Sequence, residues 1–189
     1  LARDVLKEYV SPLPRKCQTL QAVGQLLDTK RMLVRYGDLD LLTLAASEDP
    51  VSDVVADLLS KLMLLNFSSP KPDSNLSLLG VLKALRMSLT HGKCQVTGFG
   101  FVLYGAILVK LGALKDALRY GRIGLKIAQR DGHHVARATF LYHFFISHWA
   151  EPVHENVEPL LNFKWDPEAA DYCGVYFSVA FTVGRPLDL

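Results

Sequence analysis

The segment from Gly98 to Arg130 constrains the fold of this chain more than any other part of the sequence. It contains two largely apolar stretches with helical periodicity, joined by a short turn. Small residues recur through both stretches and the turn: Gly105, Gly112, Ala117, Gly121 and Gly124. A side chain of one carbon or none lets two antiparallel helices approach closely, and glycine also suits the turn. The segment therefore predicts a tightly packed helical hairpin rather than a catalytic pocket.

The hairpin has the length and small-residue pattern of one tetratricopeptide-type repeat. The second helix of the hairpin spans Leu114–Arg130, and further helices are predicted from apolar periodicity and from helix start and stop signals. They span Lys16–Tyr36, Val51–Leu65, Ser74–His91, His133–Trp149, Val153–Phe163 and Asp166–Val183. The repeat period of about 34 residues is poorly kept outside the best unit. We therefore expect an all-α fold of about nine helices, with antiparallel pairs stacked as a short, divergent tetratricopeptide-like superhelix.

Composition indicates a globular chain with no polyanionic partner. The sequence has 189 residues, of which 50% are hydrophobic and 21% charged, enough to build one core. We expect residues 1–189 to form a single α-helical repeat domain, as a piece of a larger multidomain protein. The formal net charge is only +2, and the 21 Lys and Arg residues are spread along the sequence. This spread predicts neither a nucleic-acid partner nor a membrane partner.

The cysteines favour a reducing compartment. There are three, Cys17, Cys94 and Cys173, an odd number at wide spacing. This argues against a disulfide framework, so we expect buried thiols and a cytoplasmic location. The longest apolar runs are shorter than the roughly 18 residues of a membrane span, so no transmembrane helix is predicted.

Several segments resemble the helical region of very large multi-sensor signalling kinases. In that family a protein-kinase-like region, an ATPase of the signal-transduction type (AAA/STAND), helical repeats, a GAF sensor and a histidine kinase follow one another. The segments that carry the resemblance are Phe99–Gly105, Tyr120–Lys126, His148–Pro152 and Gly184–Leu187, and the similarity is best between Leu76 and Leu161. The resemblance implies a helical connector that passes rearrangements between an ATPase and a downstream sensor or kinase. The kinase and ATPase motifs of those neighbours are not among these residues.

Histidines gather in the second half of the sequence, at His133, His134, His143, His148 and His154. Helical metal ligands need spacings of three or four residues to share a face, whereas His143 and His148 are five apart and would point about 140° from each other. We therefore expect no metal site and no cofactor. His148, next to Trp149, is expected to shape an interhelical corner, with its ring hydrogen-bonded to a carboxylate or a backbone carbonyl.

Two other patterns in the sequence do not indicate a catalytic or nucleotide-binding site. The spacing of Gly100 and Gly105 is that of a phosphate loop, but Ala106 and Ile107 stand where Lys and Ser or Thr are required. Acidic residues between Asp38 and Asp57 are typical of a solvated loop and a helix N-terminus.

Aromatic residues suggest a binding groove. In helical solenoids the first helix of each pair lines a concave surface that takes a peptide or a partner helix. Tyr142 and Trp149 are seven residues apart and would share one helical face, and Tyr104 is on the first helix of the best repeat. The groove candidates are Tyr104, Tyr142, His148 and Trp149.

The sequence thus predicts a non-catalytic helical scaffold whose partner is another protein or a neighbouring domain of the same chain. One alternative is a ligand- or metal-binding helical domain with a pocket around His143, His148 and Trp149. A second is a spacer that only holds two domains at a fixed distance.

Overall fold

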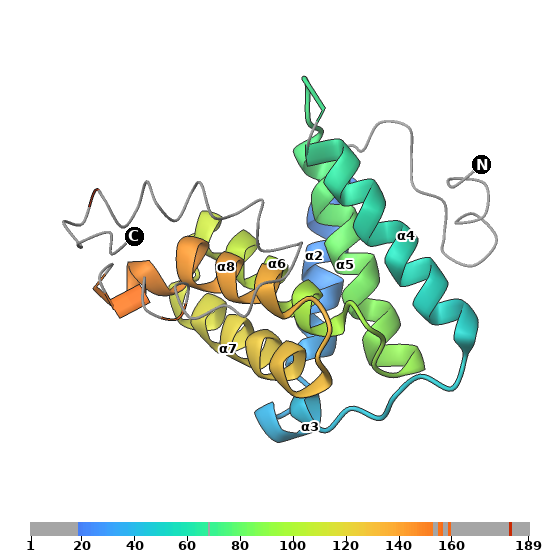
Figure 1. Cartoon of the computed structure of the whole chain (residues 1–189). Helices are drawn as coiled ribbons and strands as arrows, with labels where there is room; N and C mark the ends of the chain where they lie inside the picture. Colours follow the sequence, from blue (N-terminus) through green and yellow to red (C-terminus); the bar gives the residue numbers. More distant parts are fainter. Residues whose placement is uncertain (1–18, 68, 153–154, 157–158, 160–181, 183–189) are drawn as a thin grey trace, which may run out of the picture. The chain divides into compact units, whose positions relative to one another are not determined.

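The computed structural model describes residues 19–67, 69–152, 155, 156, 159 and 182 (Figure 1). The elements within these residues are α-helices and one 3-10 turn, and the sole strand-like feature there is an isolated parallel bridge between Ala46 and Lys93. The all-α prediction is confirmed for this part of the chain. The chain divides into two compact units, Leu1–Gly100 and Phe101–Leu189. The boundary between them falls within α6 (Thr97–Lys110). The superhelical stacking and the single repeat domain stay predictions.

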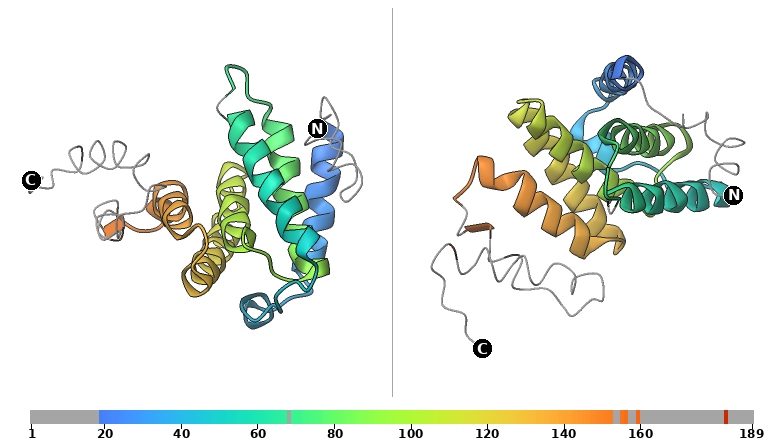
Figure 2. Two further views of the ribbon diagram at one scale, coloured as in Figure 1. Left: turned by 45° about the vertical axis from the view of Figure 1, so that its right-hand side comes forward. Right: turned by 90° about the horizontal axis from the view of Figure 1, so that it is seen from above.

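The first unit is built from α2 (Thr19–Leu33), α3 (Asp38–Leu42), α4 (Pro50–Phe67) and α5 (Ser74–His91). Helix α5 packs against both α2 and α4 and lies between them (Figures 1 and 2). Its central position explains why its residues from Leu79 to Leu85 are all buried. Apolar clusters form on both sides of it, one of Val55, Leu59 and Ala84 and another of Ala22 and Leu79.

Carboxylates begin the two longest helices of this unit. Both Val51 N, at 3.0 Å, and Ser52 Oγ, at 3.1 Å, donate to the carboxylate of Asp49, just before α4. Asp73 accepts from the backbone N–H groups of the first turn of α5, Asn75 N at 3.0 Å and Leu76 N at 3.1 Å. These bonds satisfy amides that have no partner within the helix. The predicted helix 74–91 is therefore confirmed at both ends, and the predicted helix 51–65 is confirmed with slightly wider bounds.

The short helix α3 was expected to be a solvated loop. Its acidic residues instead begin the helix, and Gly37 N donates to Asp40 Oδ2 at 2.8 Å. Leu41, fully buried, fixes this single turn to the unit. A helix of five residues is too short for apolar periodicity to reveal it.

A backbone pairing joins the segment before α4 to the segment after α5. Lys93 N donates to Ala45 O at 2.7 Å, and Ser47 N donates to Lys93 O at 2.8 Å. Gly92 makes this approach possible: its φ is +96°, and a Cβ at this position would lie 3.0 Å from both Ala45 O and Ser47 N. We call this pairing the clasp.

The second unit contains the part of α6 from Phe101 onward, α7 (Leu114–Asp131), α8 (Val135–Phe145) and the 3-10 turn η1 (Ser147–Trp149). Helices α7 and α8 pack against each other (Figure 2). None of the helices in the described parts of either unit combines the length and apolarity that a bilayer crossing requires.

The predicted helix 133–149 is wrong at its C-terminal end, because α8 stops at Phe145. Ile146 leaves helical geometry at φ −121° and ψ −63°, and Trp149 N then donates to Ile146 O in 3-10 fashion at 3.3 Å. The hydroxyl of Ser147 bonds to side chains nearby, and such bonds compete with helix continuation. The predicted helices 153–163 and 166–183 lie outside the described residues, apart from a few isolated positions.

Candidate functional site

The small residues of the predicted repeat bring three helices of the second unit together. A Cβ added at Gly105 on α6 would lie 2.9 Å from Ala117 O on α7 and 2.8 Å from Ile146 Cδ1 beyond α8. A Cβ added at Gly121 would lie 2.9 Å both from Ile146 Cδ1 and from Tyr142 Cδ2. Real Cβ atoms do not come this close to other atoms, so only glycine fits at these two places. Gly105, Ala117 and Gly121 therefore act as the close-packing residues that the sequence indicated.

The other two glycines of the repeat differ in their surroundings. Gly112, in the turn between α6 and α7, has a φ of +76° with open space around its Cα. Its role is conformational, because side-chain-bearing residues rarely adopt this backbone geometry. Gly124 is buried within α7.

Two of the four groove candidates lie in the core. Tyr104 is 1% exposed and Tyr142 is 4% exposed. The ring of Tyr104 meets the ring of Tyr120 edge to face, with centroids 5.3 Å apart. Burial raises the pKa of both Tyr104 and Tyr142. Side chains with so little exposed surface have none to offer a partner, so these two tyrosines are packing residues in this structure.

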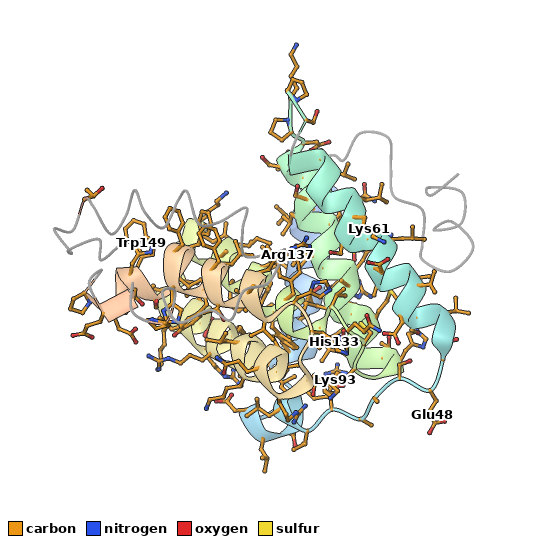
Figure 3. All side chains as sticks on the ribbon, viewed as in Figure 1. Glu48, Lys61, Lys93, His133, Arg137 and Trp149 are labelled. Atoms are coloured by element: carbon orange, nitrogen blue, oxygen red, sulfur yellow. The ribbon has the colours of Figure 1, made fainter. Side chains whose placement is uncertain are left out.

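The other two candidates lie at the end of α8, in the 3-10 turn. Figure 3 marks Trp149 beyond the last turn of α8 and Arg137 near its first turn. Trp149 is 61% exposed, and its ring stacks at a tilt on His148, with centroids 5.0 Å apart. We expected Tyr142 and Trp149 to share one helical face. They do not, because α8 ends at Phe145 and Trp149 lies in the 3-10 turn beyond it. Trp149 alone among the four candidates is well exposed.

His148 differs from its expected role in one respect. Its Nδ1 atom is buried and has no hydrogen-bond partner among the residues that the structure describes, although backbone hydrogen bonds with His143 and Phe144, of the kind expected, act on the ring and partly offset the effect of burial on its pKa. Burial lowers the pKa of His148, which keeps the ring neutral at neutral pH. The ring still shapes the corner after α8 through its contact with Trp149.

His143 is held in a network of polar side chains. Its Nδ1 lies 2.9 Å from Asn156 Oδ1 and 3.3 Å from Ser147 Oγ, and Ser147 Oγ also donates to Asn156 Oδ1. The Nδ2 group of Asn156 donates to Pro152 O at 3.1 Å and to Glu151 O at 3.3 Å. Because Nδ2 donates to these carbonyls, Oδ1 is the acceptor and His143 carries its proton on Nδ1. Sequence reasoning missed Asn156, since an isolated Asn carries no pattern.

The proximity of Ser147 to His143 does not make a nucleophilic pair. Ser147 is fully buried, and Asn156 is only 3% exposed. A nucleophilic hydroxyl must reach the substrate, and this one is enclosed and donates to Asn156 instead. Burial lowers the pKa of His143, against weaker effects of Asn156 and Glu151 that raise it. The network therefore fastens the chain after η1 to α8.

A second set of bonds holds α7 to α8. Arg122 Nε donates to Tyr142 Oη at 3.1 Å, and the guanidinium also donates to Glu151 Oε1 at 3.1 Å. These two bonds raise the pKa of Arg122 and fix its side chain on the outer side of α7.

The described residues hold no group of three His, Cys, Asp or Glu side chains placed to bind a metal ion. Of the five histidines considered as ligands, His154 lies outside these residues, and His143 makes the hydrogen bonds given above.

The first unit has its own buried polar group. Ser88 Oγ lies 2.8 Å from Thr97 Oγ1, and Cys94 N donates to Thr97 Oγ1 at 2.9 Å. Cys94 is a buried free thiol, as expected, whereas Cys17 and Cys173 lie outside the described residues. All three side chains are enclosed, so the group fixes the start of α6.

Helix α2 carries apolar side chains on two opposite faces. One face is buried against the unit through Ala22, Thr29 and Leu33, each at most 1% exposed. The other carries three large apolar side chains, Leu20, 84% exposed, Val23, 45%, and Leu27, 50%, and is continued by Val34, 72% exposed, in the turn just after the helix. We call these four residues the α2 stripe. They lie within about 60° of one another around the helix, by the 100° that each residue advances.

Comparison with known proteins adds no relative: no family model, curated protein or solved structure matches the chain. The class defined by the described residues is therefore an all-helical protein with close-packed helices and an exposed apolar stripe.

Proposed function

We propose that this chain is a non-catalytic helical scaffold that binds another protein or a neighbouring domain of its own polypeptide. The observation that carries the proposal is the α2 stripe. Large apolar side chains scattered singly over a surface are ordinary, but a row of them on one helical face is typical of an interaction site.

The spacing of the stripe indicates the shape of the partner. The steps between Leu20, Val23, Leu27 and Val34 are three, four and seven residues, a spacing that keeps side chains on the side of a helix that packs along a second helix. Gly24 lies beside them, and a Cβ added there would meet nothing within 4 Å. Glycine in a helix interior costs about 1 kcal/mol relative to alanine, and no contact inside the unit requires it here. A closely approaching helix would account for this glycine, so the proposed occupant is an amphipathic helix.

The resemblance to multi-sensor signalling kinases suggests which domain supplies that helix. On this resemblance, the proposed partner is a neighbouring ATPase or sensor domain, and the scaffold transmits rearrangements between the two. This part of the proposal rests on the sequence segments alone.

The alternative, a ligand- or metal-binding pocket around His143, His148 and Trp149, gains no support from the contacts. His143 is bound by Asn156 and Ser147, and Trp149 projects outward. Thermal unfolding with zinc and with a chelator tests this alternative, since a site that binds zinc would raise the unfolding midpoint.

The test of the scaffold function uses a photoreactive amino acid at Leu27 in cells that express the protein. The crosslinked partner is identified by mass spectrometry, purified, and titrated against the chain and its variants. Leu27→Asp is expected to weaken binding at least about tenfold, because it places a charge within an apolar interface. The matched control is Val54→Asp, since Val54 is 58% exposed on α4. Equal effects of the two substitutions, or binding unchanged by Leu27→Asp, would overturn the proposal.

A further inference from the structure

The outer face of α7 carries only positive charge. Five cationic side chains follow one another along the helix: Lys115, Arg119, Arg122, Lys126 and Arg130. Successive steps of four, three, four and four residues place them within a band of about 80°, and the row extends about 22 Å along the axis. The two acidic residues of α7, Asp116 and Asp131, fall about 100° and 160° from Lys115 and hence outside this band. We call the five residues the cationic row.

The helix that carries the cationic row is held in a fixed orientation. The opposite side of α7 is buried, including Ala117, Tyr120, Gly121 and Ile127. Those residues make the close contacts with α6 and α8, so α7 cannot turn to hide its charged face.

Two arginines of the row are already oriented by aromatic hydroxyls. Arg119 lies over the ring of Tyr120, 5.0 Å from its centroid, and its guanidinium donates to Tyr120 Oη at 3.3 Å. Arg122 is held by Tyr142, as described above. Fixing an arginine in advance lowers the conformational entropy that a partner must remove on binding.

The cationic row has more positive side chains than the described acidic residues pair with. Glu151 pairs with Arg122 at 3.1 Å, and Asp131 pairs with Arg130 at 3.1 Å. Lys115 and Lys126 are exposed and make no ion pair within the described residues. Positive charge is therefore left for a partner, over two lysines about three turns apart.

We propose that the cationic row binds an acidic helix of a partner protein. Carboxylate is the group that this face already binds, through Glu151 and Asp131. A helix with Asp or Glu at steps of four, three and four residues has the same rise as α7, so its carboxylates would meet successive cations. The proposal goes beyond the α2 stripe: it concerns the other unit and stands whether or not that stripe has a partner.

Two other polyanions fit the row less well. Single-stranded nucleic acid is held by aromatic side chains that stack on its bases, and Tyr120, the one aromatic residue of α7, is buried, as is its neighbour Tyr142. A membrane-surface helix places large apolar side chains in the interface, and Leu118 and Leu125 of α7 are half-buried in the unit.

Fluorescence anisotropy with the whole chain tests the proposal. The probe is a labelled helical peptide of about 18 residues with Glu at steps of four, three and four on a background of Ala and Gln. We expect binding at about 50 mM salt that weakens at least tenfold at about 300 mM, because exposed charge pairs are screened. A second peptide with the same composition, but with its Glu residues distributed around the helix, should bind at least several-fold more weakly.

The key variant is Lys115→Glu with Lys126→Glu, since neither side chain supports the fold through an ion pair. It should weaken peptide binding at least about tenfold. The control is Arg35→Glu with Lys71→Glu, which makes the same change of net charge at exposed positions of the first unit, and its affinity should stay within about twofold. Circular dichroism verifies that both variants keep their helices.

Four results would overturn the proposal: no binding of the acidic peptide, equal binding of the redistributed peptide, equal loss in both double variants, or tighter binding of another polyanion. For the last, a thymidine oligonucleotide and vesicles containing phosphatidylserine are titrated in parallel. Either of them binding more tightly than the peptide, and losing that binding in the key variant, would assign the row to that ligand instead.

Discussion

Replacement of Gly105 by alanine measures how closely α6, α7 and α8 are packed. The added Cβ would lie 2.8 Å from Ile146 Cδ1, 2.9 Å from Ala117 O and 3.2 Å from Gly121 N. The isoleucine methyl can move by rotation of its side chain. The carbonyl oxygen and the amide nitrogen belong to the backbone of α7, so relief of those contacts requires α6 and α7 to separate.

Two opposing effects set the expected magnitude. Alanine is favoured over glycine in a helix interior by about 1 kcal/mol. Overpacking of a well-packed core costs about 1–3 kcal/mol, and two of the contacts here are shorter than real Cβ contacts. We therefore expect Gly105→Ala to lower the free energy of unfolding by about 1–2 kcal/mol.

The same substitution at Gly24 is the matched control. Gly24 is also in a helix interior, but its added Cβ would meet nothing within 4 Å. Gly24→Ala should therefore raise the free energy of unfolding by about 0.5–1 kcal/mol. The assay is urea unfolding followed by circular dichroism and by tryptophan fluorescence, since Trp149 belongs to the second unit. If Gly105→Ala is as stable as the unmodified chain, or if the two variants shift in the same direction, the close packing described here is wrong.

Three further predictions concern stability. Thr97→Val removes the hydroxyl that accepts from Cys94 N and bonds to Ser88, and should lower the free energy of unfolding in urea by about 1–3 kcal/mol. The control Thr90→Val, at an exposed hydroxyl, should lower it by less than about 0.5 kcal/mol. Asp73→Ala removes the N-cap of α5 and should cost about 1 kcal/mol, while Asp73→Asn, which keeps an acceptor, should retain most of that stability. The pKa of His143 is lowered below 6.5 in the folded chain. As the pH falls through 6.5, the unfolded chain therefore binds more protons at this residue than the folded chain does. The free energy of unfolding should decrease as the pH is lowered from about 7.5 to about 5.5. The unfolding midpoint of His143→Gln, measured over the same range, should change less with pH, and parallel curves for the two proteins would contradict this assignment.

Helix positions were predictable where local signals agree. The helix at Ser74–His91 has a capping aspartate before it and Gly92 after it, and both of its ends were predicted. The hairpin from Thr97 to Asp131 was predictable because small residues occur where helices must approach, a requirement visible in residue type alone.

The end of α8 was not predictable from periodicity. The apolar pattern continues through Ile146 to Trp149, whereas the helix stops because Ser147 and His143 bond to Asn156. A bond between side chains nine or thirteen residues apart leaves no periodic trace in the sequence.

The candidate surfaces were predictable only in part. Aromatic type suggested a groove, but both tyrosines are in the core: the ring of Tyr142 fills the space beside Gly121, and the ring of Tyr104 packs on Tyr120. The cationic row of α7 was missed, because charge was judged along the whole sequence. Counting cations by helical face would have found it, since Lys115, Arg119 and Arg122 already follow steps of four and three.

The clasp determines where extra residues can be inserted into the first unit without disturbing its helices. Because Ala45 and Ser47 bond to Lys93, the chain enters and leaves the α4–α5 hairpin at one point, and the hairpin forms a closed ring. Its far tip is exposed at residues 70–72. Residues added there would enlarge only the tip, and each doubling of a flexible loop costs only about 0.6 kcal/mol. The tip is therefore the natural place for an inserted tag, a reporter domain or new chain termini, with the register of both helices kept by the pairing at the opposite end.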